Sequence, residues 1–181
     1  MKKGASVFAI FALIIILIGV FFGYQYYSKY YGNNVEKEGY IHIPHTANFD
    51  AIVDSISPYL KNKEQFVQVA KSKSMNQYFK AGRYRIVSGT SNTNLVNMIK
   101  AGNQTENTYR IGDFGDVYQM VGRVTRKTEL DSLRFVTDFN EIAIQKGYNN
   151  AEDLKKYFFI DTYNFFWTVT PKELFKKFEE D

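Results

Sequence analysis

The stretch Val7–Phe22, VFAIFALIIILIGVFF, decides how this chain is organised. It lies inside a run of residues 4–24 that contains no charged side chain. A helix of about 20 apolar residues spans the roughly 30 Å hydrocarbon core of a bilayer. A cleaved signal peptide has a shorter apolar region that ends in small residues, whereas this run ends in bulky aromatics, Phe21-Phe22-Gly23-Tyr24. We therefore expect a retained single-span anchor rather than a signal peptide.

The flanks of this stretch predict its orientation. Lys2 and Lys3 precede it, and the other flank is rich in tyrosine, from Tyr24 to Tyr31. Positive charge favours the cytoplasmic side, and tyrosine rings favour the membrane interface. We expect a single-pass protein of the bacterial cytoplasmic (inner) membrane, with its N-terminus inside and the bulk of the chain outside the cytoplasm.

Composition narrows the function of the exported part. About 150 residues follow the anchor, enough for one domain or two small ones. Lys2 and Lys3 account for two of the net charge of +4, and the remainder is too small to indicate a nucleic-acid partner. The absence of cysteine excludes disulfides, thiol catalysis and cysteine-ligated zinc. An exported domain without disulfides suits a bacterial envelope. No nucleotide-binding motif occurs, and no cofactor is expected.

Hydrophobic periodicity and turn residues predict an α+β fold. Strands are expected over 40–43, 82–87 and 105–111, and helices over 49–60, 65–73, 92–101, 114–126, 131–135 and 139–146. The segment 157–166 is aromatic and strand-like or irregular. Thr170-Pro171-Lys172-Glu173 is a capping box that opens a last helix, with Leu174, Phe175 and Phe178 facing inward.

Four segments carry a resemblance to a known family. Tyr40-Ile41-His42-Ile43-Pro44 is similar to an "Ile-Pro-x-Gly-x-x-Phe" opening, and Lys80–Ile86 is similar to a "kPGxYxI" strand. Leu95–Gln104 is similar to an "LixxLxxGxQ" helix exit, and Phe158–Tyr163 to an "lfPDTY" segment. In this order they resemble the YceG-like family of endolytic murein transglycosylases (MltG).

The resemblance implies a domain organisation. Residues 1–31 would hold the cytoplasmic stub, the transmembrane anchor and the interfacial aromatics, and residues 32–39 a tether. Residues 40–111 would form a LysM-like α+β subdomain, and residues 112–181 would resemble the start of an α+β catalytic domain. The family's catalytic Glu lies in an "AS-[IV]-[IV]-E-K-E" helix, and this chain has no such motif.

The resemblance implies a reaction as well. A lytic transglycosylase cleaves the MurNAc–GlcNAc bond of peptidoglycan strands and leaves 1,6-anhydro ends, with a carboxylic acid as general acid and base. No residue of this chain is assigned as catalytic, and the chain alone is predicted to be inactive. The candidates for a substrate cleft lie in the aromatic segment, and they are Asp161, Thr162, Tyr163 and Trp167.

Other residues leave alternatives open. Arg83 and Arg85 share one face of a strand, where they could contact muropeptide carboxylates or simply face solvent. His42 and His45 form an H-x-x-H pair, but only Asp50 lies nearby in sequence, and no metal site is expected.

Two functions remain open at this point, beside a third reading as a bitopic membrane protein of unrelated role. The first is a membrane-anchored lytic transglycosylase that acts in cell-wall synthesis and remodelling. Its partners would be the membrane, glycan strands and cell-wall synthases. The alternative is a non-catalytic, membrane-anchored glycan-binding or adaptor protein of the cell envelope.

Overall fold

The computed structural model describes residues 2–180, which form two compact units. The first unit contains residues 2–39, 48–79 and 86–101, and the second contains 40–47, 80–85 and 102–180. Helices and strands are mixed in the order α–β–α–α–β–α–β–α–α–β–α, with short 3-10 turns between. The predicted α+β class with one N-terminal apolar helix is therefore confirmed.

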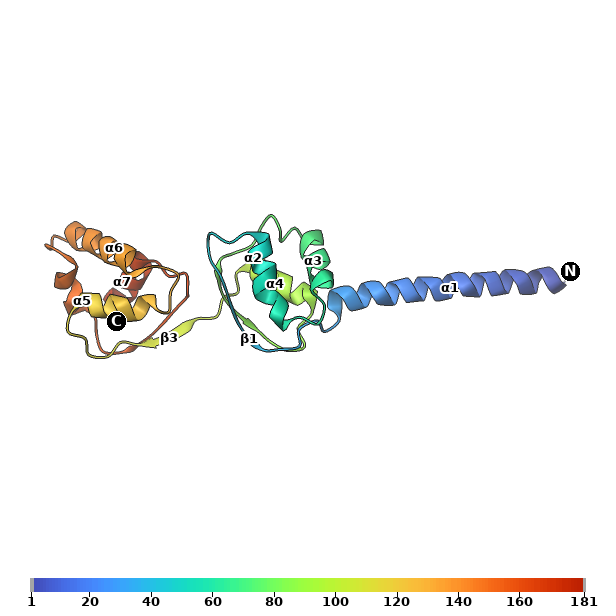
Figure 1. Cartoon of the computed structure of the whole chain (residues 1–181), viewed down its shortest axis with the longest axis horizontal. Helices are drawn as coiled ribbons and strands as arrows, with labels where there is room; N and C mark the ends of the chain where they lie inside the picture. The colour runs from blue at the N-terminus through green and yellow to red at the C-terminus, as the bar shows by residue number, and fades with distance from the viewer. Residues whose placement is uncertain (1, 181) are drawn as a thin grey trace. The chain divides into compact units, whose positions relative to one another are not determined.

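Helix α1, Lys2–Tyr31, is one continuous helix of 30 residues (Figure 1). Its segment Ile10–Tyr31 is long and apolar enough to cross a membrane, and none of it is buried. Exposed Ile, Leu and Phe side chains in such number need a nonaqueous surrounding. The helix is thus compatible with a single-pass anchor, although a signal sequence would meet the same criteria of length and composition.

Three further helices belong to the first unit: α2 (Phe49–Ile56), α3 (Lys63–Ser72) and α4 (Asn92–Ala101). Asn48 caps α2 by accepting the amide of Ala51 at 2.8 Å, in the manner of a helix N-cap. This helix is shorter than the expected 49–60, because the segment with Pro58 forms a 3-10 turn, η1 (Ser57–Tyr59). Proline removes a backbone donor, so the α-helical ladder ends before it.

A buried asparagine joins α3 and α4 of the first unit. Asn34, 5% exposed, donates to the carbonyl of Asn62 at 2.8 Å and to Oδ1 of Asn92 at 2.7 Å. Its own Oδ1 accepts the amide of Asn62 at 2.8 Å. Asn62 and Asn92 stand at the starts of α3 and α4. One side chain therefore fixes the relative position of two helix N-termini.

Strands β1 (Gly39–Ile43) and β2 (Gly82–Ile86) pair with each other, and the chain passes between the two units in both of them. Burial alternates along each strand, as the period of two predicts. Ile41 and Ile43 are buried, and so is Tyr84, whose hydroxyl donates to the carbonyl of Lys80 at 2.9 Å.

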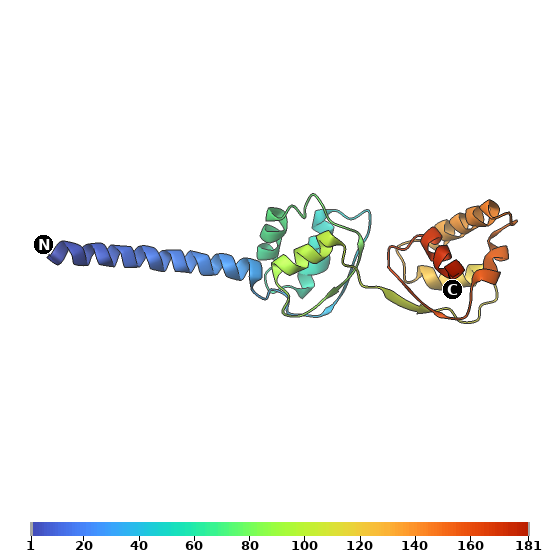
Figure 2. The same ribbon diagram turned by 180° about the vertical axis from the view of Figure 1, so that it is seen from behind.

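The second unit contains an antiparallel pair of strands, β3 (Asn107–Arg110) and β4 (Thr162–Phe165), in which residue 107 faces 165 and residue 110 faces 162. Three helices and a 3-10 segment accompany these strands (Figure 2), and they are α5 (Val117–Thr125), α6 (Ser132–Gln145), η2 (Ala151–Tyr157) and α7 (Pro171–Glu180).

Helix α6 departs from the sequence-based prediction. The sequence predicts two helices, over 131–135 and 139–146, but the structure has one continuous helix capped by Asp131. Phe135 and Phe139 lie four residues apart and their rings pack 5.0 Å apart, on one buried face of that helix. Burial of this shared apolar stripe stabilises one continuous helix, although the residues between the two phenylalanines are β-branched or acidic and favour a helix less.

The core of the second unit is largely aromatic. Phe158 lies among Phe139, Phe175 and Phe178, with ring centroids 4.8–6.5 Å away in edge-to-face arrangements. The capping box predicted for α7 is present, since Glu173 accepts both the amide and the hydroxyl of Thr170 at 2.8 Å. Leu174, Phe175 and Phe178 are buried as expected.

Candidate functional site

The solvent face of β1 and β2 brings aromatic and cationic side chains together. Tyr40 and His42 alternate with the buried isoleucines of β1, and Arg83 and Arg85 alternate with the buried Tyr84 of β2. The guanidinium of Arg83 lies 3.7 Å from the centre of the Tyr40 ring, and its Nη1 donates to the carbonyl of Glu106 at 3.2 Å. Arg83 is therefore a positioned cation stacked on an aromatic ring.

His42 meets the only tryptophan of the chain. Its ring lies 5.0 Å from the ring of Trp167 in an edge-to-face arrangement. Partial burial lowers the pKa of His42 below the ordinary 6.5, and the nearby positive charge of Arg83 lowers it further. The neutral imidazole is thus favoured, which leaves one donor and one acceptor nitrogen beside an indole ring.

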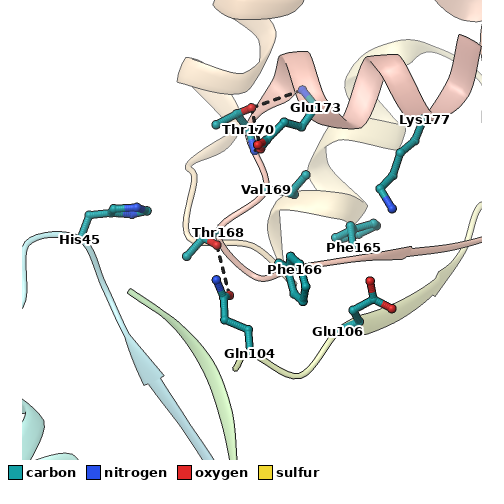
Figure 3. A pocket seen from close by; sticks show the side chains of 10 residues that line it. All are labelled: His45, Gln104, Glu106, Phe165, Phe166, Thr168, Val169, Thr170, Glu173 and Lys177. Carbon is teal, nitrogen blue, oxygen red and sulfur yellow. Dashed lines mark hydrogen bonds between the residues drawn. The ribbon is translucent and has the colours of Figure 1, made fainter. Parts of the chain in front are cut away.

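Gly82 and Gln104 meet next to this face. A Cβ at position 82 would lie 2.4 Å from Cγ and Cδ of Gln104, so only glycine leaves room for that side chain. Thr168 then donates its hydroxyl to Oε1 of Gln104 at 3.2 Å (Figure 3). The amide of Thr105 donates to the carbonyl of Arg83 at 2.8 Å. These contacts fix Gln104 from two sides.

Gln104 and Thr168 line a cavity of about 480 Å³ in the second unit (Figure 3). Its aromatic lining comes from Phe165 and from Phe166, which is 42% exposed. The remaining lining is polar or small, and consists of His45, Glu106, Val169, Thr170, Glu173 and Lys177. An aromatic surface with a few convergent polar groups is typical of a small-molecule or saccharide site.

The two carboxylates of the cavity have different surroundings. Glu173 is engaged in the capping box with Thr170, where its Oε2 accepts two hydrogen bonds. Glu106 is exposed on β3's N-terminal flank, and its carbonyl rather than its carboxylate accepts from Arg83. A general acid must be held protonated by a partly apolar pocket. Neither the Glu106 nor the Glu173 carboxylate lies in such a partly apolar pocket.

His45 is held by a single glutamate. Its amide donates to Oε1 of Glu129 at 2.7 Å, and its Nδ1 lies 2.5 Å from Oε2 of the same residue. The amide of Glu129 in turn donates to the carbonyl of Trp167 at 2.9 Å. The two histidines of the H-x-x-H pair thus face different partners, Trp167 and Glu129.

The structure separates the residues proposed for a substrate cleft. Asp161 is exposed and accepts the amide of Thr162 at 2.6 Å, and Thr162 is exposed at the start of β4. Tyr163 is 3% exposed, with its ring 4.9 Å from that of Phe178 in the core. Trp167 lies apart from these three, against His42.

The sequence predicted that Arg83 and Arg85 share one face of a strand, but it grouped Trp167 with Asp161, and it did not single out Gln104, Phe166 or Thr168. A signal for Gln104 was available. It closes the segment Leu95–Gln104, whose Gly102 ends α4 with a φ of 76°. The other two residues lie in an irregular stretch after β4 and follow no periodic pattern.

Comparison with known proteins identifies a family for this chain. The YceG-like family model matches residues 41–181, and no curated protein matches the chain. Among solved structures the chain is similar to a YceG-like protein from Listeria monocytogenes, with 15% identity and a TM-score of 0.43. That match covers 80% of this chain and 53% of the other, so the chain spans about half the length of that protein. On the family match, which covers well over half of its residues, the chain belongs to the YceG-like family.

Proposed function

We propose that this chain anchors to the bacterial cytoplasmic membrane and binds peptidoglycan strands, as part of a YceG-like lytic transglycosylase. Family membership supports the substrate class. The observation that carries the proposal is the cavity of the second unit, where the exposed ring of Phe166 lies with Gln104, Thr168 and Lys177. Aromatic faces pack against the apolar faces of pyranose rings, while amide and hydroxyl groups bond the sugar hydroxyls.

The orientation proposed for the chain follows from its N-terminal charges. Lys2 and Lys3 would stay in the cytoplasm, and both units would face the cell wall. Strand β2 then presents Arg83 and Arg85 to a polymer whose peptide stems end in carboxylates. A planar guanidinium binds a carboxylate through two hydrogen bonds. The finer division into a LysM-like subdomain, residues 40–111, and a catalytic-domain start, residues 112–181, is part of this proposal.

Binding is favoured over bond cleavage as the role of these residues. The transglycosylase reaction needs a carboxylic acid that protonates the leaving oxygen and then deprotonates the 6-hydroxyl of the muramyl residue. Of the carboxylates in the cavity, Glu173 caps α7 and Glu106 is exposed to solvent. We therefore propose that these residues bind glycan and do not themselves cleave it, as in the alternative of a glycan-binding protein.

Binding to purified glycan strands tests the proposal. The full chain in lipid nanodiscs is expected to bind the strands, and Phe166→Ala should weaken binding about tenfold, because an aromatic contact of about one to two kcal/mol is lost. Tyr118→Ala is the matched control, since Tyr118 is an exposed ring on α5 outside the cavity. Equal affinities for the two variants would reject the cavity as the glycan site.

The same preparation tests catalysis. Incubation with glycan strands should release no 1,6-anhydromuramyl ends, measured by mass spectrometry of the digested products. Dose-dependent release that Glu106→Gln abolishes would instead make the chain an enzyme and Glu106 its acid.

A further inference from the structure

The end of α1 packs against two other helices of the first unit, α3 and α4. The hydroxyl of Tyr30 donates to Oγ of Ser72 on α3 at 3.1 Å, and Nδ2 of Asn92 on α4 donates to the carbonyl of Lys29 at 2.9 Å. Within the unit, the last turns of α1 therefore lie against α3 and α4 (Figure 1). Whatever depth α1 takes in a membrane also fixes the height of α3.

A groove of about 710 Å³ lies between α1 and α3. On α1 it begins at Phe22, passes Gln25 and ends at Lys29. Seven residues of helix rise about 10 Å. Gln25 is the first amide side chain after the charge-free run of residues 4–24, so with the anchoring proposed above the groove would cross the boundary where hydrocarbon gives way to headgroups.

The wall that α3 contributes is polar. Gln65 and Gln68 line it one turn apart, and Glu64 stands beside them at the start of the helix. The groove thus has an aromatic end at Phe22, a cation at Lys29, and amides and one carboxylate opposite. A ligand that matches this order has an apolar chain, then an anionic group, then a hydrogen-bond donor.

We propose that this groove holds one phospholipid of the bilayer that α1 crosses, and the inference rests on the membrane anchoring proposed above. The acyl chain lies against Phe22, and the phosphodiester accepts hydrogen bonds from Lys29 and the amides of Gln65 and Gln68. Glu64 accepts from the ammonium or hydroxyl that ends the headgroup. Such a bound lipid fills the space between α1 and α3 and holds the first unit at a fixed height on the membrane.

Native mass spectrometry of the full chain in detergent tests this site. With phosphatidylethanolamine or phosphatidylglycerol added, the wild-type chain should retain one lipid per protein. Lys29→Gln should lower retention about tenfold, because a charge-assisted hydrogen bond is lost. Lys71→Gln is the matched control, since Lys71 is exposed on α3 and does not line the groove. Thermal unfolding checks that both variants fold as the wild type does.

Two further samples identify the ligand. Diacylglycerol, which lacks the phosphate, should be retained poorly, and glycerol 3-phosphate, which lacks the chains, should not displace the bound lipid. Equal retention in the Lys29 and Lys71 variants, equal retention of diacylglycerol, or displacement by glycerol 3-phosphate would each overturn the proposal. Phe166→Ala should leave lipid retention unchanged, so that failure of this site and failure of the glycan site are distinguishable.

Discussion

The side chain of Gln104 packs directly on the backbone of Gly82, at the place where a Cβ would stand 2.4 Å from its Cγ and Cδ. The two residues lie 22 positions apart, one in β2 and one just after α4. Each belongs to a segment that resembles the YceG-like family, Lys80–Ile86 and Leu95–Gln104. A second contact joins the same two segments: Gly102 of the segment Leu95–Gln104 packs against the side chain of Lys80, the first residue of the other segment. The two segments are therefore complementary in shape.

Replacement of Gly82 should destabilise the second unit. Gly82→Ala forces Gln104 out of its position and breaks its bond with Thr168, which should lower the free energy of unfolding by about 1–3 kcal/mol. The fluorescence of Trp167, the only tryptophan, reports urea unfolding of this unit. In the double variant with Gln104→Ala the clash is absent, so the added cost of Gly82→Ala should fall, and the cost that is left is the backbone strain of alanine at the φ of 157° that Gly82 adopts.

Gly122→Ala is the control for that experiment. Gly122 lies inside α5, and a methyl group at its Cα would meet no neighbouring atom of the described residues within 4 Å. Alanine there should stabilise the helix by about 1 kcal/mol. A similar loss of stability in both glycine variants would show that the contact with Gln104 is not the cause.

The buried Tyr84 should make stability fall at alkaline pH. Burial raises its pKa from 10.0 to about 12, so the folded state keeps a proton that the unfolded state loses. The contribution is fully present below pH 10 and is lost as the pH rises from 10 to about 12. Tyr84→Phe should flatten this decline, measured as the difference between the two urea-unfolding profiles.

The same variant has an expected cost at neutral pH. It removes the hydrogen bond to the carbonyl of Lys80, which should lower the free energy of unfolding by about 1 kcal/mol. Parallel declines of both proteins between pH 10 and about 12 would contradict the assignment of that titration to Tyr84.

His42 should titrate at a lower pH than a free histidine, because burial is the main cause of its lowered pKa. The depressed pKa means that His42 favours folding above pH 6.5 and that this contribution is lost as the pH falls. Proton NMR of the His42 ring measures the midpoint. Trp167→Ala should move it toward 6.5 by more than Arg83→Gln does. The reverse order would make charge, not burial, the dominant cause.

Loss of the Asn34 side chain should loosen the first unit. Asn34→Ala removes three hydrogen bonds, one of them to Oδ1 of the buried Asn92, at a cost of about 2–4 kcal/mol. Hydrogen–deuterium exchange should show faster exchange at the amides of α3 and α4. Asn97→Ala, at an exposed position of α4, should leave exchange unchanged. If both variants exchange alike, Asn34 does not hold the two helices.

The sequence by itself determined the features that depend on near neighbours in the chain. The apolar run, the caps at Asn48 and Thr170, and the alternation in β2 were all predictable, because helix caps and amphipathic faces involve residues within about four positions. The prediction of two helices over 131–135 and 139–146 was wrong. The packing of Phe135 and Phe139 on the core outweighed the low helix propensity of the residues between them, and one continuous helix forms.

Only the tertiary structure decided how the candidate sites are assembled. It placed Trp167 against His42, Glu129 against His45, and Gln104 on Gly82, pairs separated by 22 to 125 positions. It also left Asp161 at the surface and took Tyr163 into the core, although the two lie in one motif. No local rule specifies such pairs, because they arise when distant segments bury their apolar faces together, and the side chains that meet there are a consequence of that packing.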